Sequence, residues 1–324
     1  MEDKLAYSGI LHKIVESIIG KIDGKLQVLA NRDLLTICGE AGFIGEGDAH
    51  LPHELIETAV NRLILGKYGN RLLSSDEPER MCRETLRPLC GRLPTQSWRS
   101  SNQIIRQQFS TPPAIAYLLA YLMNWRGDET ILEPSAGTGS LAAWASCIGL
   151  ETRVNEIDPR RREMLKLLGF SPTAHNAEFI HDLLPPDAHA DCVIMNPPFS
   201  ANSRCRNASK FGFRHVESAL ERLTSGGKFG IILGNAGGLD TKTGNDFWKR
   251  LSNQVSVRSI IRVDGREYYK HGTSVDINLI TGRKLRAAGN RDWNAARKKI
   301  IQLSVDSVED AFAAVRRLGL RLNK

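Results

Sequence analysis

The sequence predicts an α/β fold in which helices cover both faces of a mostly parallel, seven-stranded sheet, preceded by a helical region. From residue 101 onward, short apolar segments alternate with helical patterns, which is typical of strand–helix–strand units. Between Leu55 and Ile64, apolar pairs recur at four-residue spacing, which indicates an amphipathic helix. We therefore expect a mostly helical N-terminal region over residues 1–100 and an α/β domain over residues 101–324.

The individual elements follow from local patterns. The glycine-rich stretch Cys38–Asp48 interrupts the N-terminal helices, and residues 73–94 are expected to form a charged connector. A helix is expected over residues 306–324, where Ser307 and Asp310 form a capping pair. Strands are expected near residues 130–133, 152–157, 179–182, 191–195, 228–233, 258–263 and 275–281.

The composition of the 324 residues is typical of a globular protein, with 41% hydrophobic and 25% charged residues. The apolar runs are too short to span a bilayer, and the start, Met-Glu-Asp-Lys, does not resemble a secretion signal. Six cysteines and eight histidines are scattered along the chain without a Cys-x-x-Cys pair. We therefore expect reduced thiols, no metal site, no membrane partner and a cytoplasmic location.

A glycine-rich turn follows the first expected strand. The turn reads Glu-Pro-Ser-Ala-Gly-Thr-Gly over residues 133–139, and its glycines allow positive φ and a close approach of a ligand to the backbone. The second expected strand ends at Glu156, where an acidic side chain suits ribose hydroxyls. Residues 137–142 also fit the Gly-x-Gly-x-x-Ala pattern of dinucleotide-binding folds. However, the Glu133 carboxylate suits the ammonium group of a methionine moiety better than it suits a pyrophosphate.

A second motif, Asn196-Pro197-Pro198-Phe199, ends the apolar segment at 191–195. The prolines stop the strand and hold Asn196 extended, which makes a stiff loop at the edge of the sheet where ligands bind. The Asn196 amide oxygen and the Pro197 carbonyl can each accept one N–H of an exocyclic amine, and Phe199 can stack on the ring that carries it. A plain tight turn with a buried phenylalanine is the alternative, and the nearby glycine turn favours the amine site.

Together the motifs resemble those of the amino-group DNA methyltransferases, in the adenine group whose cofactor half precedes the catalytic half. Leu132–Gly139 resembles their S-adenosylmethionine loop, and Asn196–Phe199 resembles their catalytic tetrapeptide. Gln108–Pro112 resembles the segment that closes over the methionine end of the cofactor, and the match covers roughly residues 103–281. The Phe-Ser-Thr-Pro start and the basic stretch after Phe199 also resemble methylase modules found beside strawberry-notch-type helicases.

The resemblance implies a Rossmann-like class I methyltransferase fold with S-adenosylmethionine as the cofactor. The implied catalytic residues are Asn196, Pro197, Pro198, Phe199 and Tyr269. The implied cofactor-binding residues are Phe109, Ser110, Thr111, Pro112, Glu133, Pro134, Ser135, Ala136, Gly137, Gly139, Glu156, Ile157, Asp182 and Leu183.

Some of these residues have distinct implied roles. Glu156 would bind the ribose hydroxyls, Ile157 would pack on the cofactor adenine, and Asp182 would accept a hydrogen bond from the cofactor's amino group. Tyr269 lies where the family has an aromatic residue that sandwiches the flipped base, and Tyr268 is its adjacent competitor.

The net charge of +8 is distributed unevenly. Residues 1–200 carry a net −5, residues 201–280 carry +6 and residues 281–324 carry +7. A polyanion that docks over the carboxyl edge of the sheet would explain this excess, and a solubilising surface is the alternative. Within the expected loop Ser200–His215, two phenylalanines alternate with basic residues, which suits phosphates and unstacked bases. The basic residues expected to bind nucleic acid are Arg204, Arg206, Lys210 and Arg214.

We therefore expect an S-adenosylmethionine-dependent adenine methyltransferase that acts on duplex DNA with the target base flipped out. RNA adenine and protein glutamine are alternative substrates, and a module that binds nucleic acid without turnover is a further alternative. Because only 43 residues follow the last expected strand, residues 1–100 are candidates for target recognition or an accessory role. A restriction enzyme or a helicase is the candidate protein partner.

Overall fold

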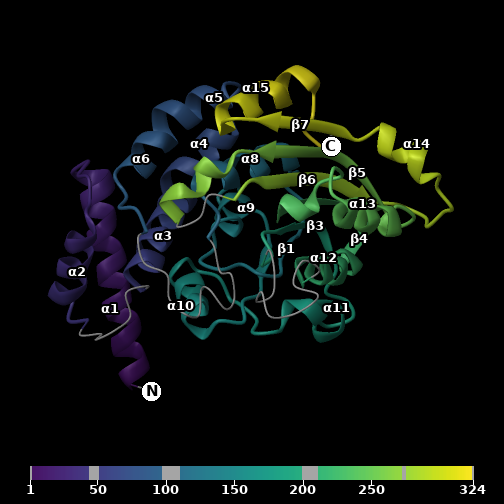
Figure 1. Ribbon diagram of the computed structural model, residues 1–324. Coiled ribbons are helices and arrows are strands. Elements are labelled where there is room, and N and C mark those ends of the chain that lie inside the picture. The colour runs from purple at the N-terminus through teal and green to yellow at the C-terminus, as the bar shows by residue number, and fades with distance from the viewer. Residues whose placement is uncertain (1, 44–50, 97–109, 199–210, 272–274, 323–324) are drawn as a thin grey trace.

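The computed structural model describes residues 2–43, 51–96, 110–198, 211–271 and 275–322. In this part of the chain, seven strands form one sheet with helices on both sides (Figure 1). The strands are β1 (Ile131–Glu133), β2 (Thr152–Val154), β3 (Ala190–Met195), β4 (Leu223–Gly234), β5 (Val255–Val263), β6 (Ile277–Lys284) and β7 (Ile301–Val305).

The strand order across the sheet is β2-β1-β3-β4-β6-β5-β7. Strand β6 runs antiparallel to both of its neighbours, β4 and β5, and the other neighbouring pairs in the described sheet are parallel. The carboxyl ends of β1, β2, β3, β4 and β5 therefore lie at the same edge of the sheet. The predicted α/β fold with a mostly parallel, seven-stranded sheet is confirmed.

Side-chain alternation along β3 separates two apolar cores. Cys192 and Ile194 contribute to a core shared with helices α8, α9, α15 and the N-terminal helices, whereas Val193 and Met195 contribute to a core shared with α12 and α13. Both faces of the strand are therefore covered, which explains its uninterrupted apolar run. These helices are α8 (Pro113–Met123), α9 (Ala142–Ser146), α12 (Phe211–Glu221), α13 (Lys242–Leu251) and α15 (Val308–Leu318).

The N-terminal region is helical, as expected, and its apolar side chains join the same core as α8 and α15. Its helices are α1 (Glu2–Ile19), α2 (Asn31–Glu40), α3 (Leu51–Leu63), α4 (Gly69–Leu73), α5 (Pro78–Met81) and α6 (Arg87–Gly91). The amphipathic pattern between Leu55 and Ile64 lies mostly on α3, which confirms that prediction. In Figure 1 the helices α4, α5 and α6 lie near α15, and α5 contacts it.

The prediction of a charged connector over residues 73–94 is wrong, because this stretch folds into α5, α6 and the helical turn between them. Two of the charges in this stretch, Arg87 and Glu79, are paired with distant residues. The Arg87 guanidinium lies 2.6 Å from Glu267 and 2.8 Å from Glu309, and Arg316 pairs with Glu79. These ion pairs tie the N-terminal region to α15 and to the segment after β5.

One expected strand is absent from its place and another was missed. Residues 177–183 form a short 3₁₀ turn and helix α11 (Ile180–Leu183), because the Asn176 side chain caps the turn by accepting from the Glu178 N–H. The missed strand is β7, an edge strand that pairs with β5. Its sequence alternates, so that Ile301, Leu303 and Val305 pack against the core while Gln302 and Ser304 are exposed.

The C-terminal capping prediction is confirmed. The Ser307 hydroxyl oxygen accepts a hydrogen bond from the Asp310 N–H at 3.1 Å, and α15 begins at Val308. The remaining described helices include α10 (Pro159–Leu167) and α14 (Trp293–Lys298). In the described segments, no helix is both long and apolar enough to cross a bilayer.

Candidate functional site

The candidate site lies where the chain leaves the carboxyl ends of β1, β2 and β3. The glycine loop follows β1, Glu156 follows β2, and Asn196 follows β3, which is the next strand in the sheet after β1. Ligands of open α/β sheets bind at this edge, so the topology brings both predicted motifs to one place.

The glycine loop takes a conformation that requires its glycines. Gly137 has φ +57° and Gly139 has φ +90°. A Cβ atom on Gly139 would lie 2.8 Å from the Leu168 Cδ1 atom, closer than side-chain carbons approach. The loop is closed by a hydrogen bond from the Gly139 N–H to the Ala136 carbonyl at 2.8 Å. Glycine at position 139 therefore allows the turn to pack closely against Leu168 and Leu165.

Glu133 is a buried carboxyl group at the end of β1. Its side chain is almost fully buried, and its Oε2 atom has no hydrogen-bond partner among the described residues. Burial raises the pKa of Glu133 well above its ordinary value, with a smaller contribution in the same direction from the Glu156 carboxylate. A buried carboxyl oxygen without a partner is unfavourable, and a cationic group placed beside it would satisfy it.

Glu156 ties the end of β2 to the glycine loop. One of its carboxylate oxygens accepts the Gly137 N–H at 2.8 Å, and the other accepts the Asp158 N–H at 2.8 Å. The carboxylate is thereby fixed beneath the loop. Because each carboxylate oxygen can accept more than one hydrogen bond, both oxygens keep capacity for the hydroxyl groups of a ligand.

The segments that the sequence predicted to contact the cofactor adenine carry exposed apolar side chains. Ile157 is 49% exposed, Leu183 is 44% exposed, and Phe179, which sequence reasoning missed, is 48% exposed. The Asp182 carboxylate lies 3.2 Å from the His181 Nε2 atom and is mostly exposed. Exposed side chains of this size are available for contact with a planar apolar ligand.

Asn196 is held by one end of its amide. The Nδ2 atom donates to the Thr111 hydroxyl oxygen at 2.9 Å, whereas the Oδ1 atom is buried without a partner among the described residues. Pro197 and Pro198 follow β3 outside any regular element. The buried Oδ1 atom is therefore an acceptor that the described residues leave unused, close to the buried Tyr268 side chain.

The two adjacent tyrosines after β5 differ in burial. Tyr269 is 67% exposed, whereas the Tyr268 ring is fully buried. Burial raises the pKa of Tyr268, and the nearby Asn196 side chain offsets part of that rise, although no hydrogen bond of ordinary geometry joins them. Tyr268 therefore packs behind the amide, and Tyr269 keeps a free ring surface.

Two residues of α3 that sequence reasoning missed contact the glycine loop. The Asn61 Nδ2 atom donates to the Thr138 carbonyl at 2.9 Å, and the Thr138 hydroxyl donates to Glu57 at 3.0 Å. Their spacing of four residues on an amphipathic helix was visible in the sequence, but nothing in it indicated what this polar face contacts. The N-terminal region is thus part of the wall of the site.

The predicted basic loop is only partly described. Phe109, Phe199, Arg204, Arg206 and Lys210 lie outside the described residues. Residues 211–215 are the start of α12, so the prediction that Ser200–His215 is a loop throughout is wrong. Arg214 lies on that helix, 2.6 Å from Glu178.

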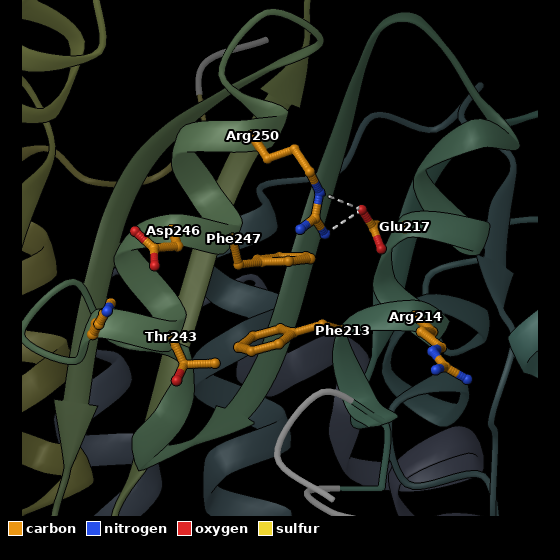
Figure 2. Close-up of a pocket in the computed structure, with 8 residues that line it drawn as sticks. Phe213, Arg214, Glu217, Thr243, Asp246, Phe247 and Arg250 are labelled. Carbon is orange, nitrogen blue, oxygen red and sulfur yellow. Dashed lines mark hydrogen bonds and ion pairs between the residues drawn. The ribbon is translucent and has the colours of Figure 1, made fainter. Parts of the chain in front are cut away.

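The aromatic part of the predicted loop is also corrected. Phe213 is buried and stacks on Phe247 with ring centroids 4.2 Å apart, because α12 turns it into the core. It is therefore unavailable for stacking on bases. Figure 2 shows the two rings at a groove of about 420 Å³ between α12 and α13, where Arg250 pairs with Glu217. The groove is lined by Phe213, Arg214, Glu217, Lys242, Thr243, Asp246, Phe247 and Arg250.

No protein-family model matches the chain, and no curated protein matches it. Several solved structures match it. A protein assigned as a class I S-adenosylmethionine-dependent methyltransferase from Listeria monocytogenes is 13% identical, with a TM-score of 0.53, and the match covers 96% of this chain and 97% of that one. The match therefore includes the N-terminal helices.

Two further similar structures are modification subunits of type I restriction enzymes. The subunit from Vibrio vulnificus is 14% identical with a TM-score of 0.52, and the match covers 90% of this chain and 62% of that one. The subunit from Streptococcus thermophilus is 16% identical with a TM-score of 0.51, and the coverages are 89% and 62%. This chain thus spans about three fifths of each subunit. The similarities show that the chain has the Rossmann-like class I methyltransferase fold.

Proposed function

We propose that this protein is an S-adenosylmethionine-dependent methyltransferase that methylates the exocyclic amine of adenine in DNA. The observation that carries the proposal is the Asn196 amide, whose Nδ2 atom is occupied by Thr111 while its Oδ1 atom stays buried and unpartnered. This acceptor lies beside a glycine loop at the carboxyl edge of a class I methyltransferase fold. An acceptor placed in this way suits an incoming N–H donor.

The residues around the loop fit S-adenosylmethionine. The unpartnered Glu133 oxygen suits the ammonium group, Glu156 suits the ribose hydroxyls, and the exposed side chains of Ile157 and Leu183 suit the two faces of the adenine. Asp182 would accept from the adenine amino group. When bound, the cofactor supplies an electrophilic methyl group on its sulfonium.

The protein's own contribution to the reaction is positioning. Asn196 Oδ1 and the Pro197 carbonyl would each accept one N–H of the target amine, which frees the nitrogen lone pair for attack on the methyl group. The amine then sheds its extra proton after the transfer, so no general base is needed beforehand. Tyr269 and Phe199 would hold the ring that carries the amine. Much of the acceleration would come from this orientation of the reacting atoms.

DNA is the proposed substrate because of the charge distribution and the nature of the amine site. The excess of basic residues lies after residue 200, which places it after the Asn196–Phe199 motif in the chain. A base within a duplex has to leave the stack to reach Asn196, so base flipping is part of the proposal. Two similar structures are subunits of restriction enzymes, which supports a DNA-modifying role and a restriction or helicase partner.

The test is methyl transfer from radiolabelled S-adenosylmethionine to unmethylated DNA, to RNA and to bulk protein in parallel. We expect the label in DNA, and digestion to nucleosides should recover it as N6-methyl-2′-deoxyadenosine. Label in RNA or in protein glutamine would replace the proposed substrate. Cofactor binding without transfer to any of the three would instead favour a nucleic-acid-binding module.

A further inference from the structure

We infer that Glu57 is a positioning residue that couples the glycine loop to the amide of Asn196. The inference rests on the proposed function and assigns a role in it to the N-terminal helices. Glu57 lies on α3 and is separated from Asn196 by two intervening residues of another segment. Its role would be to fix the relative placement of the two motifs rather than to contact the reacting atoms.

Helix α3 contacts the glycine loop through two polar side chains. Glu57 and Asn61 are one helical turn apart and share a face of α3. Asn61 donates to the Thr138 backbone carbonyl, and the Thr138 hydroxyl donates to the Glu57 Oε2 atom at 3.0 Å. Thr138, the residue between the two loop glycines, is therefore held through both its backbone and its side chain.

The same Glu57 oxygen accepts a hydrogen bond from a second donor. The Ser110 hydroxyl donates to Glu57 Oε2 at 2.5 Å, and the next residue, Thr111, accepts from the Asn196 Nδ2 atom at 2.9 Å. A continuous path of hydrogen bonds and one peptide unit thus runs from Thr138 through Glu57 to Asn196. Hydrogen bonds to a carboxylate are stronger than neutral ones, which makes Glu57 the strongest link.

Helix α3 is itself anchored to α10 by ion pairs. Glu54, one turn before Glu57, pairs with Arg160 at 2.5 Å and with Arg161 at 2.9 Å. Arg161 is buried directly beneath the loop, where a Cβ atom on Gly137 would lie 3.5 Å from its guanidinium. Because the helix is fixed on this side, a movement of Thr138 would be passed to Ser110 and Thr111 rather than absorbed by α3.

The experiment compares E57A and E57Q with the wild type. A matched control is E16A, which removes another glutamate that contacts α3, through a half-exposed pair with Arg62 at 3.1 Å. Three quantities are measured for each protein. These are the Kd of S-adenosylmethionine by calorimetry, kcat for DNA at saturating cofactor, and hydrogen exchange of residues 110–120 with and without S-adenosylhomocysteine.

We expect E57A to lower kcat at saturating cofactor by about tenfold or more, since a hydrogen bond to a charged group is lost. Ligand-induced protection of residues 110–120 should disappear in E57A, persist partly in E57Q and be unchanged in E16A. Ser110→Ala should not reduce the protection of residues 110–120 any further in the E57A background. Wild-type kcat together with wild-type protection in E57A would overturn the inference, even if its melting temperature were lower.

If E57A fails to fold, T138V replaces it, because that substitution removes only the hydroxyl that donates to Glu57. It should show the same loss of protection, and retained protection would overturn the coupling. The two proposals fail in different ways. A wild type that binds the cofactor but leaves DNA unmethylated contradicts the proposed function, while the exchange experiment still tests the coupling. A wild type that binds no cofactor overturns both.

Discussion

The glycine loop after β1 and the amide loop after β3 lie at the same edge of the sheet, but they are held in different ways. The glycine loop is shaped by the positive φ of Gly137 and Gly139, by a hydrogen bond from the Gly137 N–H to the Glu156 carboxylate, and by Asn61 and Glu57 of α3. Asn196 is held by Thr111, 85 residues earlier, and lies beside Tyr268 from the segment after β5.

This difference predicts that substitutions in the two loops have different effects. The proposed cofactor side combines the local backbone geometry of the turn with contacts from α3, so substitutions at Glu156 and at the loop glycines should mainly change cofactor affinity. The target side depends on the packing of distant segments, so substitutions there should change turnover. The following variants test whether cofactor affinity and turnover respond separately.

The largest effect is expected for Asn196→Ala. Loss of the positioned acceptor should reduce methyl transfer by about 10²-fold or more, as for other preorganised hydrogen-bonding groups in active sites. The Kd of S-adenosylmethionine, measured by calorimetry, should stay within a few-fold of the wild-type value because in the proposed function the amide contacts the target amine and not the cofactor. Normal turnover in this variant would remove Asn196 from the catalytic assignment, and a large loss of cofactor affinity would contradict the separation itself.

The second effect is expected for Glu156→Ala. Removing this carboxylate should weaken cofactor binding by about 1.5–3 kcal/mol, the range for hydrogen bonds to a charged group. Calorimetry should show this loss, while kcat at saturating cofactor should change little. Glu163→Ala is a suitable control, since that glutamate lies on α10 and pairs with Lys166 at 2.8 Å. If the two variants bind S-adenosylmethionine equally well, Glu156 has only a structural role.

The third effect concerns DNA affinity. Neutralising Arg204, Arg206, Lys210 and Arg214 together should reduce the slope of log K against log salt by about 2, since each phosphate contact contributes about 0.9. Arg214→Ala alone should have little effect, because Arg214 already pairs with Glu178. Cofactor affinity should be unchanged in both proteins. A quadruple variant with the wild-type slope would move the DNA-binding face to the basic residues after 281.

The smallest effect is a pH dependence of stability from Glu133. Its pKa is raised in the folded protein by burial, so the unfolded state ionises first as the pH rises. The stabilisation is complete below the ordinary pKa and is lost as the pH rises through the folded pKa, by at most about 1.4 kcal/mol per pH unit. Chemical denaturation should show that Glu133→Gln lacks this decline. If both proteins decline equally, another group is responsible.

The sequence was most informative where a motif is determined by its own residues. The glycine loop and the end of β3 were predicted because glycine conformation and proline chemistry are local properties. Helix α15 was predicted because Ser307 caps it within three residues. The fold class followed from the same local signals, since alternating strands and helices leave few arrangements of the sheet.

The rest depended on contacts between distant residues. Residues 179–182 have apolar content suited to a strand, but the Asn176 cap made them helical. Phe213 was read as a surface aromatic, and only the direction of α12 showed that it is buried against Phe247. The bracing role of Glu57 was not predictable, because its partners are 53 and 81 residues away.

The bridge made by Arg87 has a consequence for the order of folding during synthesis. Its two carboxylate partners, Glu267 and Glu309, follow it by 180 and 222 residues. Helices α5 and α6 are made early, yet their polar contacts become complete only after α15 has been synthesised. A nascent chain would therefore carry the partly buried Arg87 side chain without either partner until Glu267 is made, and without the second until Glu309 follows. The bridge is consequently completed late, in a step that joins early and late parts of the chain.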